Sequence, residues 1–194
     1  MAANKDLEQQ YGRAMEEHGF LPDPENQRYG SMGLCWRHTS QQGGGFFWTY
    51  GQQDLYTIKI HDFFFHEDQL LEFHWPESLS VTWYESISGE EFSPCRRLVP
   101  GCVKSFIGGR EPYRALIHRQ IPIVSIGVEI TPAYYRDYLR RQFPQEYQSL
   151  LESFQTLDQT EHFPEMVQLL KQVRDYRGEG LPARLFYDGK VAEA

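Results

Sequence analysis

The sequence predicts an α+β protein in which an all-β domain precedes a helical region, and three observations support this. Residues 29–131 hold short apolar or alternating runs separated by turn-rich stretches, which is typical of an all-β domain. After Thr131 the apolar residues recur with a helical period. The two patterns meet in "VSIGVEITPAYYRDYLRRQF" (residues 124–143), so we expect the last strand to lead directly into the first helix.

Length, charge and cysteine content limit the classes of protein that fit. The 194 residues suffice for one good-sized core. A formal net charge of −8 argues against this chain binding nucleic acid by itself, because such binding needs clustered lysine and arginine. The three cysteines have no CxxC spacing, and no run resembles a signal peptide or a transmembrane helix. We therefore expect a cytoplasmic protein without a membrane contact, a disulfide framework or a zinc site.

Residues 1–28 are predicted to form an N-terminal arm or lead-in. The stretch "MAANKDLEQQYGRAMEEHG" is polar and acidic and fits one helix, and "LPDPEN" after it has the composition of a turn. An arm of this kind can be disordered or can fold over a partner.

The β domain is predicted over residues 29–131. Its expected strands are "MGLCWRHT", "FFWTY", "LYTIKIHDFFFH", "SLSVTWYESI", "VKSFI", "YRALIHR" and "PIVSIGVEI". Strands this short at this spacing indicate a sandwich, a jelly roll or a small barrel.

The helical region is predicted over residues 132–194, with helices at 132–142, 144–157, 164–176 and from 182 to 194. Each begins with a proline near its first turn, where the missing N–H costs nothing, and Thr131 is the expected N-cap of the first helix. The third helix carries an apolar stripe. We expect its Met166, Leu170 and Val173 to form a dimerisation surface, and the alternative is a place in the chain's own core.

No pattern of catalytic or metal-binding residues stands out. His61 and His66 are an odd number of residues apart, so a strand would point them to opposite faces and they should not share a metal. The sequence has no His-x-His pair, no GxSxG motif and no phosphate-binding loop. We therefore predict no catalytic residue, no metal ligand and no cofactor, and we expect that the chain is not an enzyme.

Aromatic residues with polar tips on successive strands favour a ligand pocket. A cavity for an organic molecule needs aromatic walls and a few polar groups. The candidate ligand-binding residues are Trp36, His38, Trp48, Tyr50, His61, Phe63 and Trp83. For each of them, packing in the core of the β domain is the alternative.

Three stretches resemble the N-terminal regulatory region of AraC-type bacterial transcription regulators. They are "FFFHEDQLLEFHWPESLSVTWYESISGEEFSPCRRLVPGCVKSFIGG", "YRALIHRQIPIVSIGVEITPAYYRDYL" and "LPARLFYDGKVAEA". The resemblance implies a cupin-like jelly roll or barrel that binds an effector (29–131) and a helical dimerisation and linker region (132–194). It also implies a C-terminal DNA-binding domain with helix-turn-helix units, which is absent from this chain.

The resulting hypothesis is an effector-sensing and dimerisation domain of a transcription regulator. It would bind a small organic effector, form a homodimer and contact DNA only through the absent domain. Two alternatives stay open, namely a stand-alone cupin-like metal-dependent enzyme, such as an isomerase or dioxygenase, and a ligand-free protein-interaction module. The identity of the effector and the sign of its effect are also open.

Overall fold

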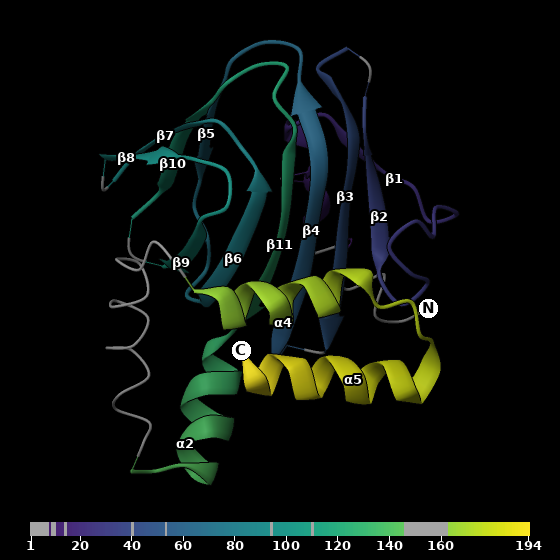
Figure 1. Cartoon of the computed structure of the whole chain (residues 1–194), viewed down its shortest axis with the longest axis vertical. Coiled ribbons are helices and arrows are strands. Elements are labelled where there is room, and N and C mark those ends of the chain that lie inside the picture. Colours follow the sequence, from purple (N-terminus) through teal and green to yellow (C-terminus); the bar gives the residue numbers. More distant parts are fainter. Residues whose placement is uncertain are drawn as a thin grey trace.

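The computed structural model describes residues 8, 11–13, 15–39, 41–52, 54–93, 95–109, 111–145 and 163–194. Two antiparallel sheets dominate these residues (Figure 1). The larger sheet has the order β1 (Phe20–Pro22), β2 (Leu34–His38), β3 (Gly43–Gln52), β4 (Tyr56–Phe65), β11 (Ile123–Ile130), β6 (Leu79–Ser86) and β9 (Val103–Ile107). The smaller sheet has the order β5 (Gln69–Phe73), β10 (Tyr113–Ile117), β7 (Gly89–Phe92) and β8 (Cys95–Leu98). Both agree with a cupin-like β domain.

Alternating side chains give the larger sheet two apolar faces. On β4 the even-numbered Tyr56, Ile58 and Ile60 belong to one buried cluster, whereas the odd-numbered Phe63 and Phe65 belong to another. Successive side chains of a strand point to opposite faces, so both faces of β4 are covered. The strand sequence is accordingly apolar with few interruptions.

One face of the larger sheet is covered by two helices, α4 (Pro164–Asp175) and α5 (Gly180–Glu193), which cross its lower part in Figure 1. The helices and this face of the sheet share a single buried cluster. Within the region predicted over 132–194, α4 and α5 therefore pack as a layer on the sheet. Met166, Leu170 and Val173 are at most 5% exposed and lie in this layer, inside the chain's own core.

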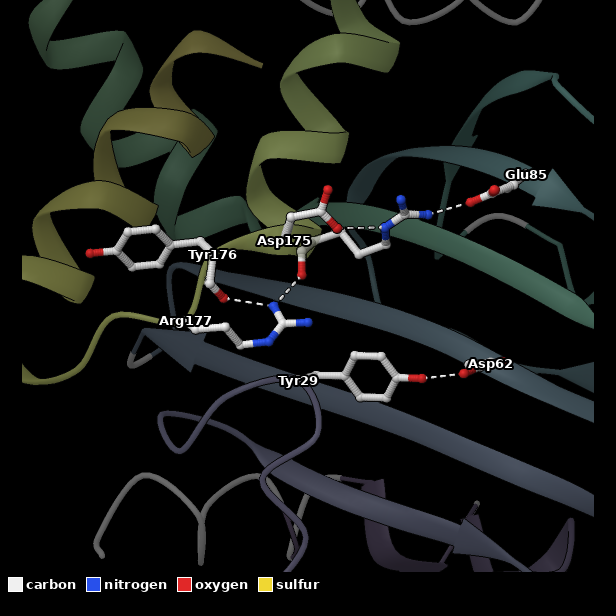
Figure 2. Close-up of polar contacts among 7 residues, drawn as sticks. Tyr29, Asp62, Glu85, Asp175, Tyr176 and Arg177 are labelled. Carbon is white, nitrogen blue, oxygen red and sulfur yellow. Dashed lines mark hydrogen bonds and ion pairs between the residues drawn. The ribbon is translucent and has the colours of Figure 1, made fainter.

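Polar contacts fix the end of α4 to the sheet (Figure 2). Arg174 pairs with Glu85 at the end of β6 and with Asp175, whose Oδ1 lies 3.1 Å from Arg174 Nε. The guanidinium of Arg177 donates to the main-chain carbonyls of Arg174 and Tyr176 at 2.6 and 2.8 Å. These bonds satisfy carbonyls that the end of the helix leaves open.

The strand-to-helix junction differs in detail from the prediction. β11 leads directly into η1 (Ala133–Leu139), a π-helix, which continues into α2 (Arg140–Gln142). The predicted N-cap role of Thr131 is wrong, because its hydroxyl donates to the carbonyls of Asp54 and Leu55 instead. The junction is thereby tied to the turn before β4. The helix predicted at 144–157 falls almost entirely outside the described residues.

The N-terminal lead-in is partly folded. Residues 11–13 and 15–17 are helical, and β1 pairs with β2. Tyr11 and Phe20 are only 4% and 3% exposed and belong to the second buried cluster, on the side of the sheet away from α4 and α5. The lead-in therefore closes part of the space between the two sheets.

Candidate ligand-binding cavity

The space between the two sheets contains a cavity of about 590 Å³. A volume of this size holds a small organic molecule. Residues of both sheets line the cavity, and Tyr11, Met15 and His18 of the lead-in complete the wall.

A cross-strand row of residues forms one level of the cavity wall. Lys59 of β4 is opposite Gly127 of β11, Gly127 is opposite Thr82 of β6, and Thr82 is opposite Lys104 of β9. Gly127 has no side chain, and a Cβ atom there would lie 2.4 Å from Thr82 Oγ1. The Thr82 hydroxyl therefore lies beside Gly127 in the middle of the row, which has a lysine at each end.

Lys59 is held in an aromatic and anionic environment. Its Nζ donates to Glu129 Oε2 at 2.7 Å, and it lies 4.5 Å from the ring centre of Trp75 and 5.2 Å from that of Tyr11. Burial lowers the pKa of Lys59, but the Glu129 carboxylate and the Tyr11 hydroxyl raise the pKa more, so the amine stays charged. The Tyr11 hydroxyl also reaches Glu129 Oε1 at 3.5 Å.

A second ion pair joins the two sheets. Lys104 of β9 pairs with Glu91 of β7, and both side chains are at most 14% exposed. Burial, and then the charge of Glu91, raise the pKa of the neighbouring Tyr84. Burial also raises the pKa of Tyr113, with Tyr84 and Glu91 adding to the effect. Both phenols are therefore hydrogen-bond donors at neutral pH.

His61 lies in the next row of the wall, between the ion pairs and the phenylalanine-lined part. Its Nδ1 is 2.6 Å from Ser125 Oγ, and its ring stacks on Phe47 at 4.7 Å. The ring faces the cavity but is enclosed by protein. Burial, followed by the charge of Lys59, lowers its pKa to about 3, so the imidazole is neutral at pH 7.

The wall beyond His61 on β4 is apolar. Phe63 and Phe65 follow His61 on the same face of β4, and Ile123 is opposite Phe63. Phe63 contacts Phe65 and Phe20 with ring centres 5.5 and 4.8 Å apart. This end of the cavity offers no charged group from these residues.

The structure divides the predicted ligand-binding residues between two faces. His61 and Phe63 line the cavity. Trp36 and His38 lie on the same side of the sheet, where Trp36 is fully buried and donates to Thr49 Oγ1 at 3.4 Å. His38 is enclosed by phenylalanines, and its Nε2 has no hydrogen-bond partner among the described residues.

Trp48, Tyr50 and Trp83 lie on the opposite face, under the helices. Trp48 donates to the carbonyl of Gly30 at 3.2 Å, and Tyr50 packs on Tyr187 of α5 with ring centres 4.7 Å apart. Lys171 of α4 lies 4.8 Å from the ring centre of Trp83. The structure therefore does not bring these three residues to the cavity.

Sequence reasoning missed the charged residues of the wall. Lys59, Glu91, Lys104 and Glu129 were not recognised because their partners are distant in the sequence. A usable signal did exist, since Lys59 and Glu129 alternate with buried apolar residues on strands covered on both faces. A charge at such a position needs a partner or a ligand.

The described residues do not fit a metal centre of the kind that the cupin fold often holds. No group of three His, Cys, Asp or Glu side chains in the described ranges is arranged to hold an ion. The two histidines of the cavity wall are His18 and His61, and His61 is hydrogen-bonded to Ser125. The part of the chain that the structure describes therefore holds no set of three ligands for the metal-dependent alternative from the sequence. Among the helices of the described residues, none is long and apolar enough to cross a membrane.

No protein-family model and no curated protein matches the chain. Similar solved structures include KdgF from Halomonas sp., at 9% identity over 44% of this chain and 76% of that one, with a TM-score of 0.33. A sugar phosphate isomerase of the cupin superfamily from Silicibacter pomeroyi matches at 13% identity over 43% and 59%, with a TM-score of 0.31. The nucleoside dehydratase Pac13 from Streptomyces matches at 13% over 48% and 79%, with a TM-score of 0.31.

These similarities concern the fold alone, and they agree with a cupin-like β fold. The chain spans 59% of the isomerase. None of the comparisons supports membership of the AraC family. The isomerase and the dehydratase are enzymes, which contradicts our expectation that the chain is not an enzyme. That expectation was wrong and is dropped.

Proposed function

We propose that the chain binds a small organic molecule in the cavity between its two sheets. The observation that carries the proposal is the pairing of a drug-sized cavity with two enclosed ion pairs on its wall, Lys59–Glu129 and Lys104–Glu91. Enclosing charged groups costs free energy. If these four positions served only to pack the interior, apolar residues there would make the protein more stable.

The same wall supports metal-independent acid–base catalysis on the bound molecule. The carboxylate of Glu129 can accept a proton from a carbon next to a carbonyl group. The electron pair of that C–H bond forms a carbon–carbon double bond while the π pair of the carbonyl moves onto its oxygen, where the ammonium of Lys59 stabilises the charge. The 2.7 Å contact between Lys59 and Glu129 places the two roles side by side.

A second candidate is effector sensing in an AraC-type regulator. It is favoured by the lead-in, because Tyr11, Met15 and His18 line the cavity. An occupant could then shift the lead-in between two positions, and a DNA-binding domain and a dimer partner would respond.

The experiment is thermal unfolding of the chelator-treated protein against a panel of small metabolites, since a ligand that binds only the native state raises the midpoint. The variant Thr82→Phe fills the cavity, and circular dichroism checks its fold. Saturable shifts that Thr82→Phe abolishes support the proposal. An unchanged midpoint with every compound contradicts it.

The bound compound then separates catalysis from sensing. Proton NMR of the compound with catalytic amounts of protein reports any conversion or exchange of its C–H protons with solvent. Exchange lost in Glu129→Gln favours the enzyme. An unaltered compound, with the lead-in changing its protection from proteolysis on binding, favours the sensor.

A further inference from the structure

The cavity is polar at one end and apolar at the other, and we propose that it takes an amphipathic molecule with an uncharged head and an aliphatic or aromatic tail. The head would occupy the level of Lys59, Gly127 and Lys104, and the tail would lie among Phe63, Phe65 and Ile117. This inference rests on the proposed function and names the class of its ligand.

The larger sheet shows the gradient along one strand. The cavity-facing residues of β4 run from Lys59 through His61 to Phe63 and Phe65. Phe65 follows Lys59 by six positions, which corresponds to roughly 20 Å of extended strand. A molecule that contacts both ends must therefore be elongated.

The adjacent strand repeats the gradient in the same direction. β11 is antiparallel to β4 and places Gly127 opposite Lys59, and Ile123 opposite Phe63. The polar and apolar levels are thus continuous across strands.

Strand β10 of the smaller sheet has the same polarity. On β10, Tyr113 lies near Glu91 of the second ion pair, whereas Ile117 lies in the apolar cluster with Phe63 and Phe65. The backbone N–H of Gln120 donates to the carbonyl of Phe65 at 2.8 Å, which brings the chain after β10 to the apolar end of β4. β10 therefore runs from a polar to an apolar end in the cavity, as β4 does.

Charge balance decides the nature of the head. The described residues of the wall include three cationic side chains, Lys59, Arg96 and Lys104, and three anionic ones, Glu91, Glu111 and Glu129. His61 is neutral at pH 7 because burial lowers its pKa. A charged head would leave one net charge enclosed, which is costly. An uncharged head with hydroxyl or amide groups can accept from the lysines and donate to the carboxylates.

The Thr82 hydroxyl beside Gly127 gives the head a polar contact between the two lysines. The row Lys59, Gly127, Thr82 and Lys104 crosses four strands, so the lysine backbones are roughly 14 Å apart at the usual strand spacing. Gly127 itself adds no side chain to that span. Thr82 offers a hydroxyl beside it.

The test measures dissociation constants by calorimetry for four probes, three of which carry the same six-carbon chain. Hexyl β-glucoside has a neutral head and a tail, methyl β-glucoside has the same head without the tail, and heptanoate and hexylamine carry a charged head. We expect hexyl β-glucoside to bind at least tenfold more tightly than each of the others. Equal binding of methyl β-glucoside, or tighter binding of heptanoate or hexylamine, overturns the proposal.

Two neighbouring residues provide a matched pair of variants. Phe63→Leu shortens the tail wall, and Phe64→Leu makes the same change on the other face of β4, away from the cavity. We expect Phe63→Leu to weaken hexyl β-glucoside about fivefold or more and Phe64→Leu to leave its binding unchanged. Equal effects of both variants contradict a tail site at Phe63.

The head site is tested by Thr82→Val, which removes one hydroxyl. We expect weaker binding of hexyl β-glucoside and a smaller preference over heptanoate. The double variant Arg114→Met/Glu72→Leu removes an exposed ion pair outside the cavity and serves as the control. If no probe binds but a metabolite of the thermal panel does, the ligand class is wrong and the proposed function stands. If nothing binds, both are wrong.

Discussion

The ammonium of Lys59 and the carboxylate of Glu129 meet at 2.7 Å on adjacent strands, inside the protein and facing its cavity. Each side chain is 11% exposed. Burying one charge without the other is costly, whereas removing both is much less so. This relationship determines how single and double variants should differ.

We expect Lys59→Met to lower the free energy of unfolding by about 3 kcal/mol, because it leaves Glu129 unpaired. The double variant Lys59→Met/Glu129→Leu should recover most of this loss. Urea unfolding of the four proteins of the cycle measures the coupling. A loss in the double variant equal to the sum of the two single losses would show that the pair contributes nothing.

The stability of the protein should fall in mild acid. The folded-state pKa of His61 is about 3, below its ordinary value of 6.5, so the unfolded chain binds the proton more readily between these values. The contribution of neutral His61 to the free energy of unfolding is complete above about pH 6.5. It is lost as the pH falls toward 3, and the free energy of unfolding then changes by up to about 1.4 kcal/mol per pH unit. Burial lowers the pKa of His18 and His38 in the same direction.

Urea midpoints at pH 7.5, 6.0 and 4.5 measure this slope. His61→Gln should flatten it, because glutamine does not titrate and can still bond to Ser125. His74→Gln, which changes an exposed histidine, is the control. A slope that His61→Gln leaves intact would assign the loss to other groups.

Gly127→Ala should distort the cavity wall. The added Cβ would lie 2.4 Å from Thr82 Oγ1 and 3.3 Å from the carbonyl oxygen of Val81, so β11 and β6 must separate or Thr82 must rotate. We expect a loss of about 1–3 kcal/mol, as for other overpacked sites. Thr82→Ala in the same chain should restore part of the loss, which thermal unfolding of the double variant checks. Full additivity of the two changes would refute the clash.

The three cysteines should differ in reactivity. Cys95 is exposed, whereas Cys35 is 1% exposed and burial raises the pKa of its thiol to about 12. Burial also raises the pKa of Cys102. Iodoacetamide at pH 8 should modify Cys95 first and Cys35 only after unfolding, because the thiolate is the reactive form. Mass spectrometry of peptides locates the label.

Local patterns predicted much of the fold. The turn-separated strands and the direct passage from β11 into a helix follow from periodicity and from Pro132. The π-helical form of η1 does not, because α- and π-helices differ by one residue in hydrogen-bond spacing and share a similar apolar pattern. The role of Thr131 depends on the carbonyls of Asp54 and Leu55, more than seventy residues earlier in the chain.

The cavity was harder to predict because alternation identifies two faces without saying which one meets the ligand. On β3, Trp48 and Tyr50 were chosen, whereas Phe47 lines the cavity. Trp48 and Tyr50 are on the face that packs against α5. Only the position of the helices shows which face of β3 they cover and which face is left for the cavity. Predicting the ion pairs requires the register between neighbouring strands, and the periodicity of a single strand does not give that register.

β4 separates the cavity from the layer of helices α4 and α5. Odd positions such as His61 and Phe63 face the cavity, and even positions such as Ile58 and Ile60 face the helices. The two sets of positions can therefore be varied independently. Substitutions at the odd positions change which ligand is preferred, whereas unchanged even positions keep the helices packed on the sheet. For this protein, mutational libraries should be built by parity along the strand and not by segment.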